Sequence, residues 1–215
     1  MLQAAAFSAL RHERFADLKA KLAAAAQRPA AGQEPLIPSA LSAIDPLLGG
    51  GFPAGALVTL EGPLSSGRWG IAAALLANAT HRGLGAVIDS GELYPPSLEA
   101  AGVRLERLLV VPATTSVSIA RAVDLLLRSR IVRVVVMAEA ALRAAVWVRL
   151  ASLAHRTGAL LVVVAARVWP ELSANATVRL GLTCAKARMC GAHGPWKTFT
   201  GFDVCASVRK SKMRR

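Results

Sequence analysis

The stretch that most constrains the fold of this chain is Gly62-Pro63-Leu64-Ser65-Ser66-Gly67-Arg68-Trp69. It follows an apolar run, 56–60, that predicts a strand, and it precedes an Ala/Leu-rich run, 70–80, that predicts a helix. Strand, Gly/Ser loop and helix are the layout of a phosphate-binding P-loop, whose signature is G-x-x-x-x-G-K-[ST]. Gly62 and Gly67 keep the spacing of that signature.

The chemistry of the signature is not kept. Arg68 occupies the position of the lysine, and its wide planar guanidinium is not a conservative replacement for a compact ammonium. Trp69 occupies the position of the hydroxyl that ligates magnesium, and its side chain has no oxygen. Backbone N–H groups at the helix start could still attract an anion. We therefore predict a vestigial loop that holds no cofactor and no metal, made of Gly62, Ser65, Ser66, Gly67, Arg68 and Trp69.

Apolar segments of strand length alternate with helical segments after the loop. The predicted strands are 85–89, 108–111, 132–137 and 159–166, and the predicted helices are 93–101, 116–130 and 140–156. This alternation predicts an α/β fold with a mainly parallel sheet and helices on both faces. Two later strands, 177–183 and 202–208, are expected to form an antiparallel C-terminal edge.

Four segments are expected along the chain. They are an N-terminal helix (1–28), a linker rich in proline (29–40), the α/β core (41–208) and a mobile basic tail (209–215). The N-terminal helix either packs on its own domain or reaches a second copy of the chain. The sequence leaves both open.

Composition indicates a cytoplasmic protein. Hydrophobic residues make up 54% of the chain, yet no window has the eighteen or so consecutive apolar residues of a membrane span. No signal peptide is evident, and three cysteines do not make a disulfide framework.

The net charge of +13 lies entirely in the second half. Residues 1–120 hold nine basic and nine acidic side chains, whereas residues 121–215 hold seventeen and four. This asymmetry points to a polyanion or an acidic protein as partner, or to a generally solvated basic surface. The candidate partner- or DNA-binding residues are Arg149, Arg156, Lys186, Arg188, Lys197, Arg209, Lys210, Lys212, Arg214 and Arg215.

The chain resembles the RecA recombinase family over residues 41–212. The approach to the loop (41–55), the Ser65-Ser66 pair, the strand Val87-Ile88-Asp89 and the strand 177–180 carry the resemblance. Lys210-Ser211-Lys212 is similar to the Lys-x-Lys that members of that family place at a neighbour's nucleotide.

The departures from the RecA pattern are systematic. The resemblance implies a magnesium-organising Asp where Ala138 stands, a water-activating Glu where Gly91 stands and a phosphate-sensing Gln where Ala166 stands. With Arg68 and Trp69, five positions of one reaction centre are changed. We therefore predict a protein that is not an enzyme. The segment between the strand 132–137 and the next helix is also too short for a RecA DNA-binding loop.

A basic, RecA-like chain of this kind resembles the ImuA proteins. The resemblance implies a non-catalytic accessory role in SOS, error-prone translesion synthesis, with RecA and the inactive polymerase homologue ImuB as partners, nucleoid-associated in the cytoplasm and possibly in contact with DNA. A SulA-like cell-division inhibitor and a residual RecA-class ATPase are the alternatives.

Metal and nucleophile chemistry have weak support in the sequence. Cys184, Cys190, His193 and Cys205 match no common structural zinc spacing, so buried packing is the expected role of the cysteines. His12 and His155 stand alone on predicted helices.

Overall fold

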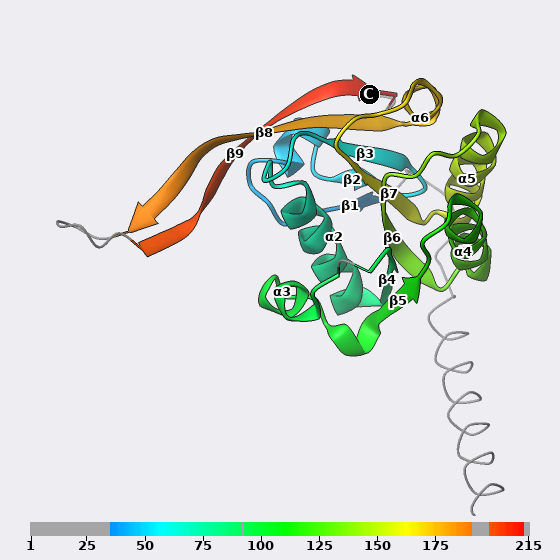
Figure 1. Cartoon of the computed structure of the whole chain (residues 1–215), viewed down its shortest axis with the longest axis horizontal. Coiled ribbons are helices and arrows are strands. Elements are labelled where there is room, and N and C mark those ends of the chain that lie inside the picture. The colour runs from blue at the N-terminus through cyan, green and yellow to red at the C-terminus, as the bar shows by residue number, and fades with distance from the viewer. Residues whose placement is uncertain (1–34, 92, 191–197, 213–215) are drawn as a thin grey trace, which may run out of the picture. The chain divides into compact units, whose positions relative to one another are not determined.

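The computed structural model describes residues 35–91, 93–190 and 198–212, which belong to one compact unit, Glu34–Arg215 (Figure 1). The predicted N-terminal helix and its proposed self-association lie outside the described residues. So do Lys197, His193, Arg214 and Arg215.

A seven-stranded sheet in the order β5-β4-β6-β7-β3-β8-β9 forms the centre of this unit. Its strands are β3 (Leu57–Glu61), β4 (Leu84–Asp89), β5 (Leu108–Pro112), β6 (Val132–Ala138), β7 (Leu160–Ala165), β8 (Val178–Cys190) and β9 (Thr198–Ser211). Every neighbouring pair is parallel except β8 and β9, which are antiparallel. The predicted α/β fold with an antiparallel edge is confirmed, with β8 itself joined in parallel to β3.

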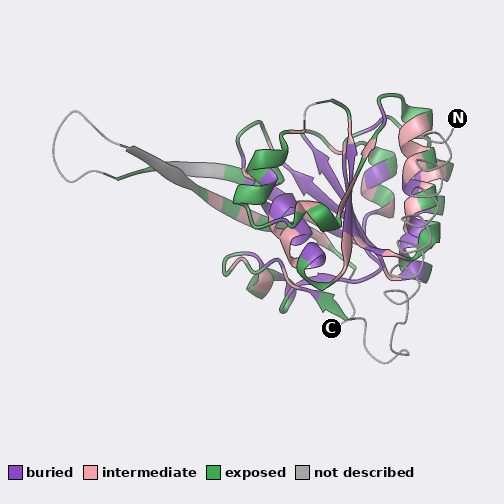
Figure 2. Ribbon diagram, turned by 90° about the horizontal axis from the view of Figure 1, so that it is seen from below, coloured by how far each residue is buried: buried purple, intermediate pink, exposed green. Residues whose placement is uncertain are grey.

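Helices cover both faces of the sheet. They are α2 (Arg68–Arg82), α3 (Pro95–Ala100), α4 (Ser116–Ser129), α5 (Ala144–Thr157) and α6 (Pro170–Asn175), with short 3-10 turns at Asp45–Leu48 and Leu105–Arg107. One apolar core joins α2 and α3 to the sheet, and a second core joins α4, α5 and α6 to the opposite face. In Figure 2 the strands between these helices are almost wholly buried, which explains their continuous apolar sequences.

The strand, loop and helix predicted at the start of the fold are present. β3 ends at Glu61, the loop follows, and α2 begins at Arg68. The five residues of β3 are all buried. The loop is therefore fixed at the carboxyl edge of the sheet, where ligands of open α/β sheets bind.

The predicted linker is structured at its C-terminal end. β1 (Leu36–Ile37) pairs antiparallel with β2 (Phe52–Pro53), and the Ile37 side chain is buried in the core. The Asp45 carboxylate accepts hydrogen bonds from the backbone N–H groups of Ser39 and Ala40. The folded core thus begins before residue 41, because this segment buries an apolar side chain and pairs its backbone.

The C-terminal segment is not a mobile tail as far as Ser211. β9 extends to that residue, and Lys210 pairs with Arg179 of β8. β8 and β9 also run well past the predicted strands and continue beyond the other strands as a long two-stranded ribbon (Figure 1). Arg209 and Lys210 are therefore held in a sheet.

In the part of the chain that the structure describes, no helix has the length and apolarity that a membrane crossing requires.

Candidate functional site

The loop after β3 packs directly against β8. A Cβ atom at Gly62 would lie 2.2 Å from the Leu182 carbonyl oxygen and 2.7 Å from Ser66 Oγ. Ser66 is buried, and its hydroxyl has no hydrogen-bond partner in the described structure. Ser65 has a φ of 60°, in the left-handed region that non-glycine residues seldom adopt. The loop thus keeps a strained, tightly fitted backbone.

The end of the loop packs against β9. Gly67 has a φ of 85°, and a Cβ atom there would lie 2.6 Å from Val204 Cγ2. The next two side chains diverge: Arg68 is buried, whereas Trp69 is 41% exposed. The two residues that depart from the P-loop signature therefore have very different surroundings.

The other three positions predicted to depart from the RecA pattern lie at or just after the carboxyl ends of strands. Ala138 is the last residue of β6, Gly91 follows β4 by two residues, and Ala166 follows β7 directly. Asp89 at the end of β4 uses its carboxylate to accept hydrogen bonds from the backbone N–H groups of Gly91 and Leu93. This carboxylate stabilises its own turn.

Glu139, the acid beside Ala138, also has a structural contact. Its Oε2 accepts hydrogen bonds from the backbone N–H groups of Ala166, at 2.9 Å, and Arg167, at 3.4 Å. Its own N–H donates to the Val164 carbonyl. Glu139 therefore fixes the segment that leaves β7.

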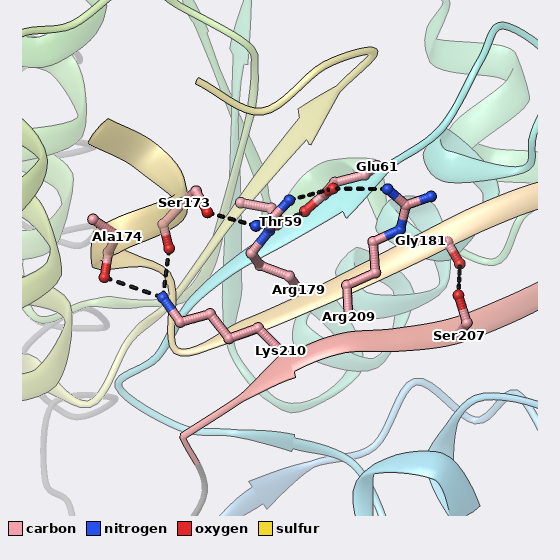
Figure 3. A network of polar contacts seen from close by, with 9 residues as sticks. All are labelled: Thr59, Glu61, Ser173, Ala174, Arg179, Gly181, Ser207, Arg209 and Lys210. Atoms are coloured by element: carbon pink, nitrogen blue, oxygen red, sulfur yellow. Dashed lines mark hydrogen bonds and ion pairs between the residues drawn. The ribbon is translucent and has the colours of Figure 1, made fainter. Parts of the chain in front are cut away.

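A buried ion pair joins the end of β3 to β8 (Figure 3). Arg179 Nε donates to Glu61 Oε1 at 2.5 Å, and Nη2 donates to Oε2 at 2.8 Å. Thr59 Oγ1 donates to Oε1 as well. The Glu61 side chain is only 6% exposed and that of Arg179 is 21% exposed. A bidentate pair of this kind is among the stronger charge-assisted contacts.

The pKa of Glu61 reflects two opposing effects. Burial raises it, but the hydrogen bonds from Arg179 and Thr59 and the positive charges of Arg179 and Arg209 outweigh burial and hold the pKa below its ordinary value. The pKa of Arg179 is raised by its hydrogen bond to Glu61, against the effect of burial. Both groups stay charged at neutral pH.

A β-bulge brings Arg209 into this cluster. Val208 pairs with Leu180 and Lys210 pairs with Arg179, so Arg209 is the extra residue between them. Its side chain crosses Gly181, where a Cβ atom would lie 2.2 Å from Arg209 Nε, and it reaches within 3.9 Å of Glu61 Oε2. Consecutive side chains of a regular strand point to opposite faces. The bulge interrupts this alternation, so Arg209 and Lys210 both lie beside the Glu61–Arg179 pair.

The lysines of the Lys-x-Lys segment bind the chain's own α6. Lys210 Nζ donates to the carbonyl groups of Ser173 and Ala174, and Lys212 Nζ also donates to Ala174 (Figure 3 shows the Lys210 contacts). Cations at a helix C-terminus satisfy its free carbonyl groups. Burial, then the charges of Lys212 and Arg179, lower the pKa of Lys210.

A pocket of about 450 Å³ opens beside the cluster. Its lining combines the loop, the segment after β7 and the two C-terminal strands: Glu61, Gly62, Pro63, Ala166, Arg167, Val168, Arg179 and Arg209. It therefore carries three guanidinium groups and one carboxylate.

The predicted binding residues do not form a single patch. Arg149 and Arg156 are exposed on α5, and Arg149 Nε binds Asp124 Oδ1 of α4 at 2.8 Å. Lys186 and Arg188 lie on the ribbon, where Arg188 pairs with Asp203. Among the described members of this set, only Arg209 lines the pocket beside the loop, whereas Lys210 and Lys212 contact α6.

Cys190 and Cys205 lie far apart on the ribbon. Cys205 pairs with Thr183, whereas Cys190 lies opposite Thr198, seven residues further along β8. At about 3.3 Å per residue this separates them by roughly 23 Å, too far to ligate the same ion. Both are exposed, contrary to the expected burial. Among the described residues no three His, Cys, Asp or Glu side chains form a metal-binding group.

Three residues that line the pocket were not predicted from the sequence as site residues: Glu61, Arg167 and Arg179. Glu61 ends the wholly buried β3, and Arg179 lies between the buried residues Val178 and Leu180 of β8. A charge in a buried strand needs a partner, so their joint presence was a usable signal. Arg167 gave no such signal, since it follows its strand in an irregular segment.

Comparison with known proteins places this geometry in context. Residues 46–171 match the family model described as the MT3502 N-terminal domain. The chain is 37% identical to protein RecA of Picosynechococcus sp. over 103 residues, which are 47% of this chain and 30% of that protein. It is also 37% identical to protein RecA of Thermus thermophilus over 108 residues, 49% of this chain and 32% of that protein. The matches thus span about a third of the length of these curated relatives.

The fold is similar to the crystal structure of the RadB recombinase. The two superpose with a TM-score of 0.65 at 17% identity, over 84% of this chain and 92% of the other. At this identity the similarity establishes a shared fold.

Proposed function

Because this chain belongs to the family of the MT3502 N-terminal domain and has a RecA-like fold, we propose that it is a non-catalytic accessory protein of the RecA class. Its role would be to support DNA-damage-induced, error-prone translesion synthesis by binding RecA and ImuB, with DNA as a further contact. It would carry out no nucleotide chemistry of its own.

The observation that carries the proposal is the set of residues around one sheet edge. Trp69 at the start of α2 and Ala138 at the end of β6 offer no magnesium ligand. Gly91 and Ala166 follow β4 and β7 without a side chain that could activate water or sense a phosphate. Metal and water activation supply much of phosphoryl-transfer catalysis, so loss at all these positions favours a binding role.

The first test measures nucleotide binding. Thermal unfolding of the full chain is followed with and without ATP and Mg²⁺, with RecA as positive control. A ligand that binds only the folded state stabilises that state by RT ln(1 + [L]/Kd) and so raises the unfolding temperature. We expect no rise for this chain. A Mg²⁺-dependent rise would support the residual ATPase and contradict the proposal.

The second test addresses the partners. Purified chain is titrated against immobilised RecA and ImuB, and DNA-damage-induced mutagenesis is measured in cells that lack the gene and receive it back. We expect binding to both proteins and restored mutagenesis, also with the variant Trp69→Thr. Restored cell-division arrest without restored mutagenesis would assign the SulA-like alternative.

A further inference from the structure

The pocket beside the loop has an excess of positive charge that its own residues do not neutralise. The Glu61 carboxylate is occupied by the bidentate contact with Arg179. Arg209 lies 3.9 Å from the same carboxylate, and its side chain is 56% exposed. Arg167 is exposed at the rim, and no ion pair joins it to another residue of the described ranges. Two guanidinium groups are therefore available to an anion.

The positions of these two arginines are fixed by the surrounding backbone. Glu139 holds the N–H groups of Ala166 and Arg167 and so sets the wall of the pocket after β7. The bulge in β9 and the lack of a side chain at Gly181 let Arg209 lie across β8 toward the pocket. A preorganised guanidinium loses less conformational entropy when it binds a planar anion.

Two exposed apolar side chains come next in the sequence to residues that line the pocket. Leu64, next to Pro63 in the loop, is 85% exposed, and Trp169, next to Val168, is 52% exposed. Tryptophan and arginine are enriched among the residues that dominate protein–protein binding energy. A small free anion would leave these apolar groups in water, whereas a peptide would cover them.

We infer that this pocket receives a carboxylate of an acidic peptide segment on a protein partner, with apolar neighbours of that carboxylate packed on Leu64 and Trp169. Arg167 and Arg209 are the residues that bind the carboxylate, and Gly181 and Glu139 are positioning residues. The assignment rests on the proposed accessory function and gives it a recognition site.

The test selects peptides from a random, phage-displayed dodecapeptide library on the immobilised full chain. We expect the enriched peptides to share an Asp or Glu next to large apolar residues. In fluorescence anisotropy, Arg209→Gln and Arg167→Gln should each weaken the best peptide at least tenfold, as should replacing its acid by the amide. Arg121→Gln, at an exposed arginine on α4, is the matched control and should bind as the wild type does.

Gly181→Ala supplies a second, independent variant. The added methyl group displaces only the end of the flexible Arg209 side chain, so circular dichroism should be unchanged while peptide affinity falls. The assignment is overturned by an absence of acidic enrichment, or by equal losses in Arg121→Gln and Arg209→Gln. Preferential binding of a single-stranded oligonucleotide that Arg209→Gln abolishes would assign the pocket to DNA instead. Failure of the accessory function itself would show separately, as Mg²⁺-dependent ATP binding.

Discussion

Arg179 and Glu61 meet through two parallel N–H···O contacts between neighbouring strands, one residue before the loop that follows β3. The same guanidinium donates to Ser173 Oγ of α6. Arg179 therefore links the start of the loop to α6, the helix whose Ser173 carbonyl also accepts a hydrogen bond from Lys210. The stability of this edge of the sheet depends on that pair.

Removal of Arg179 should destabilise the fold. Arg179→Ala leaves the buried Glu61 carboxylate without its main partner, and we expect a loss of about 3 kcal/mol in the free energy of unfolding, measured by urea denaturation. Glu61→Leu combined with Arg179→Met removes both charges and should recover most of that loss. An Arg179→Ala variant as stable as the wild type would contradict the role given to this pair.

Stability should fall in acid partly through Glu61. Its pKa in the folded chain lies below the ordinary value of 4.5, so below that pH the unfolded state binds more protons. The stabilisation is present above pH 4.5 and is lost as the pH falls through the folded pKa. In the Glu61→Gln variant, the free energy of unfolding should therefore fall less steeply as the pH is lowered below 4.5.

Asp124 provides the comparison for the acid limb. Its pKa is also lowered, chiefly by the hydrogen bond from Arg149, but Arg149 and Arg128 in its ion pairs are each 55% exposed. Exposed pairs contribute little. Asp124→Asn should therefore change the acid limb less than Glu61→Gln does, and the reverse order would argue against burial as the distinguishing factor.

The loop glycines should be required for packing. Gly62→Ala pushes a methyl group into the Leu182 carbonyl, so β8 must move, and we expect a loss of about 3 kcal/mol. Gly67→Ala combines a left-handed φ with a clash at Val204 and should also destabilise. Gly70 has open space around its Cβ position, and Gly70→Ala should stabilise α2 by about 0.5 kcal/mol. Urea denaturation of the three variants measures these changes.

Glu139 should protect the segment after β7. Glu139→Ala removes the acceptor for the N–H groups of Ala166 and Arg167, and each lost contact is worth about 1 kcal/mol. Hydrogen exchange should accelerate at these two amides. Asp89→Ala, which removes a comparable acceptor after β4, should accelerate exchange at Gly91 and Leu93 and leave Ala166 and Arg167 unchanged.

The parallel strands were predictable because their sequences carry the signal directly. The buried residues of β6 and β7 form continuous apolar runs, and turn residues separate them from the helices. The start of α5 was placed four residues early, at 140, because the Ala-rich segment 140–143 has helical composition. The hydrogen bonds of Glu139 to the chain after β7 hold the chain just before that segment in place, a contact no local pattern reveals.

The pocket could not be predicted from local sequence patterns, because it also depends on contacts between distant segments. It depends on a bulge that re-aims Arg209 and on Glu61 meeting Arg179 across 118 residues of sequence. Ala138 and Ala166 lie at strand ends, as predicted, because the apolar runs of β6 and β7 mark where these strands end. It placed the cationic residues in one functional group, whereas the fold distributes them over α5, the ribbon and the end of β9.

The close fit of Gly62 beneath the Leu182 carbonyl has a bearing on how such chains are recognised. The neighbouring strand alone requires a glycine at this position, whether or not a triphosphate binds at the site. Glycine spacing of this type can persist for architectural reasons long after its original ligand has ceased to matter. Searches for nucleotide-using proteins should accordingly weigh the lysine and hydroxyl positions above the two glycines.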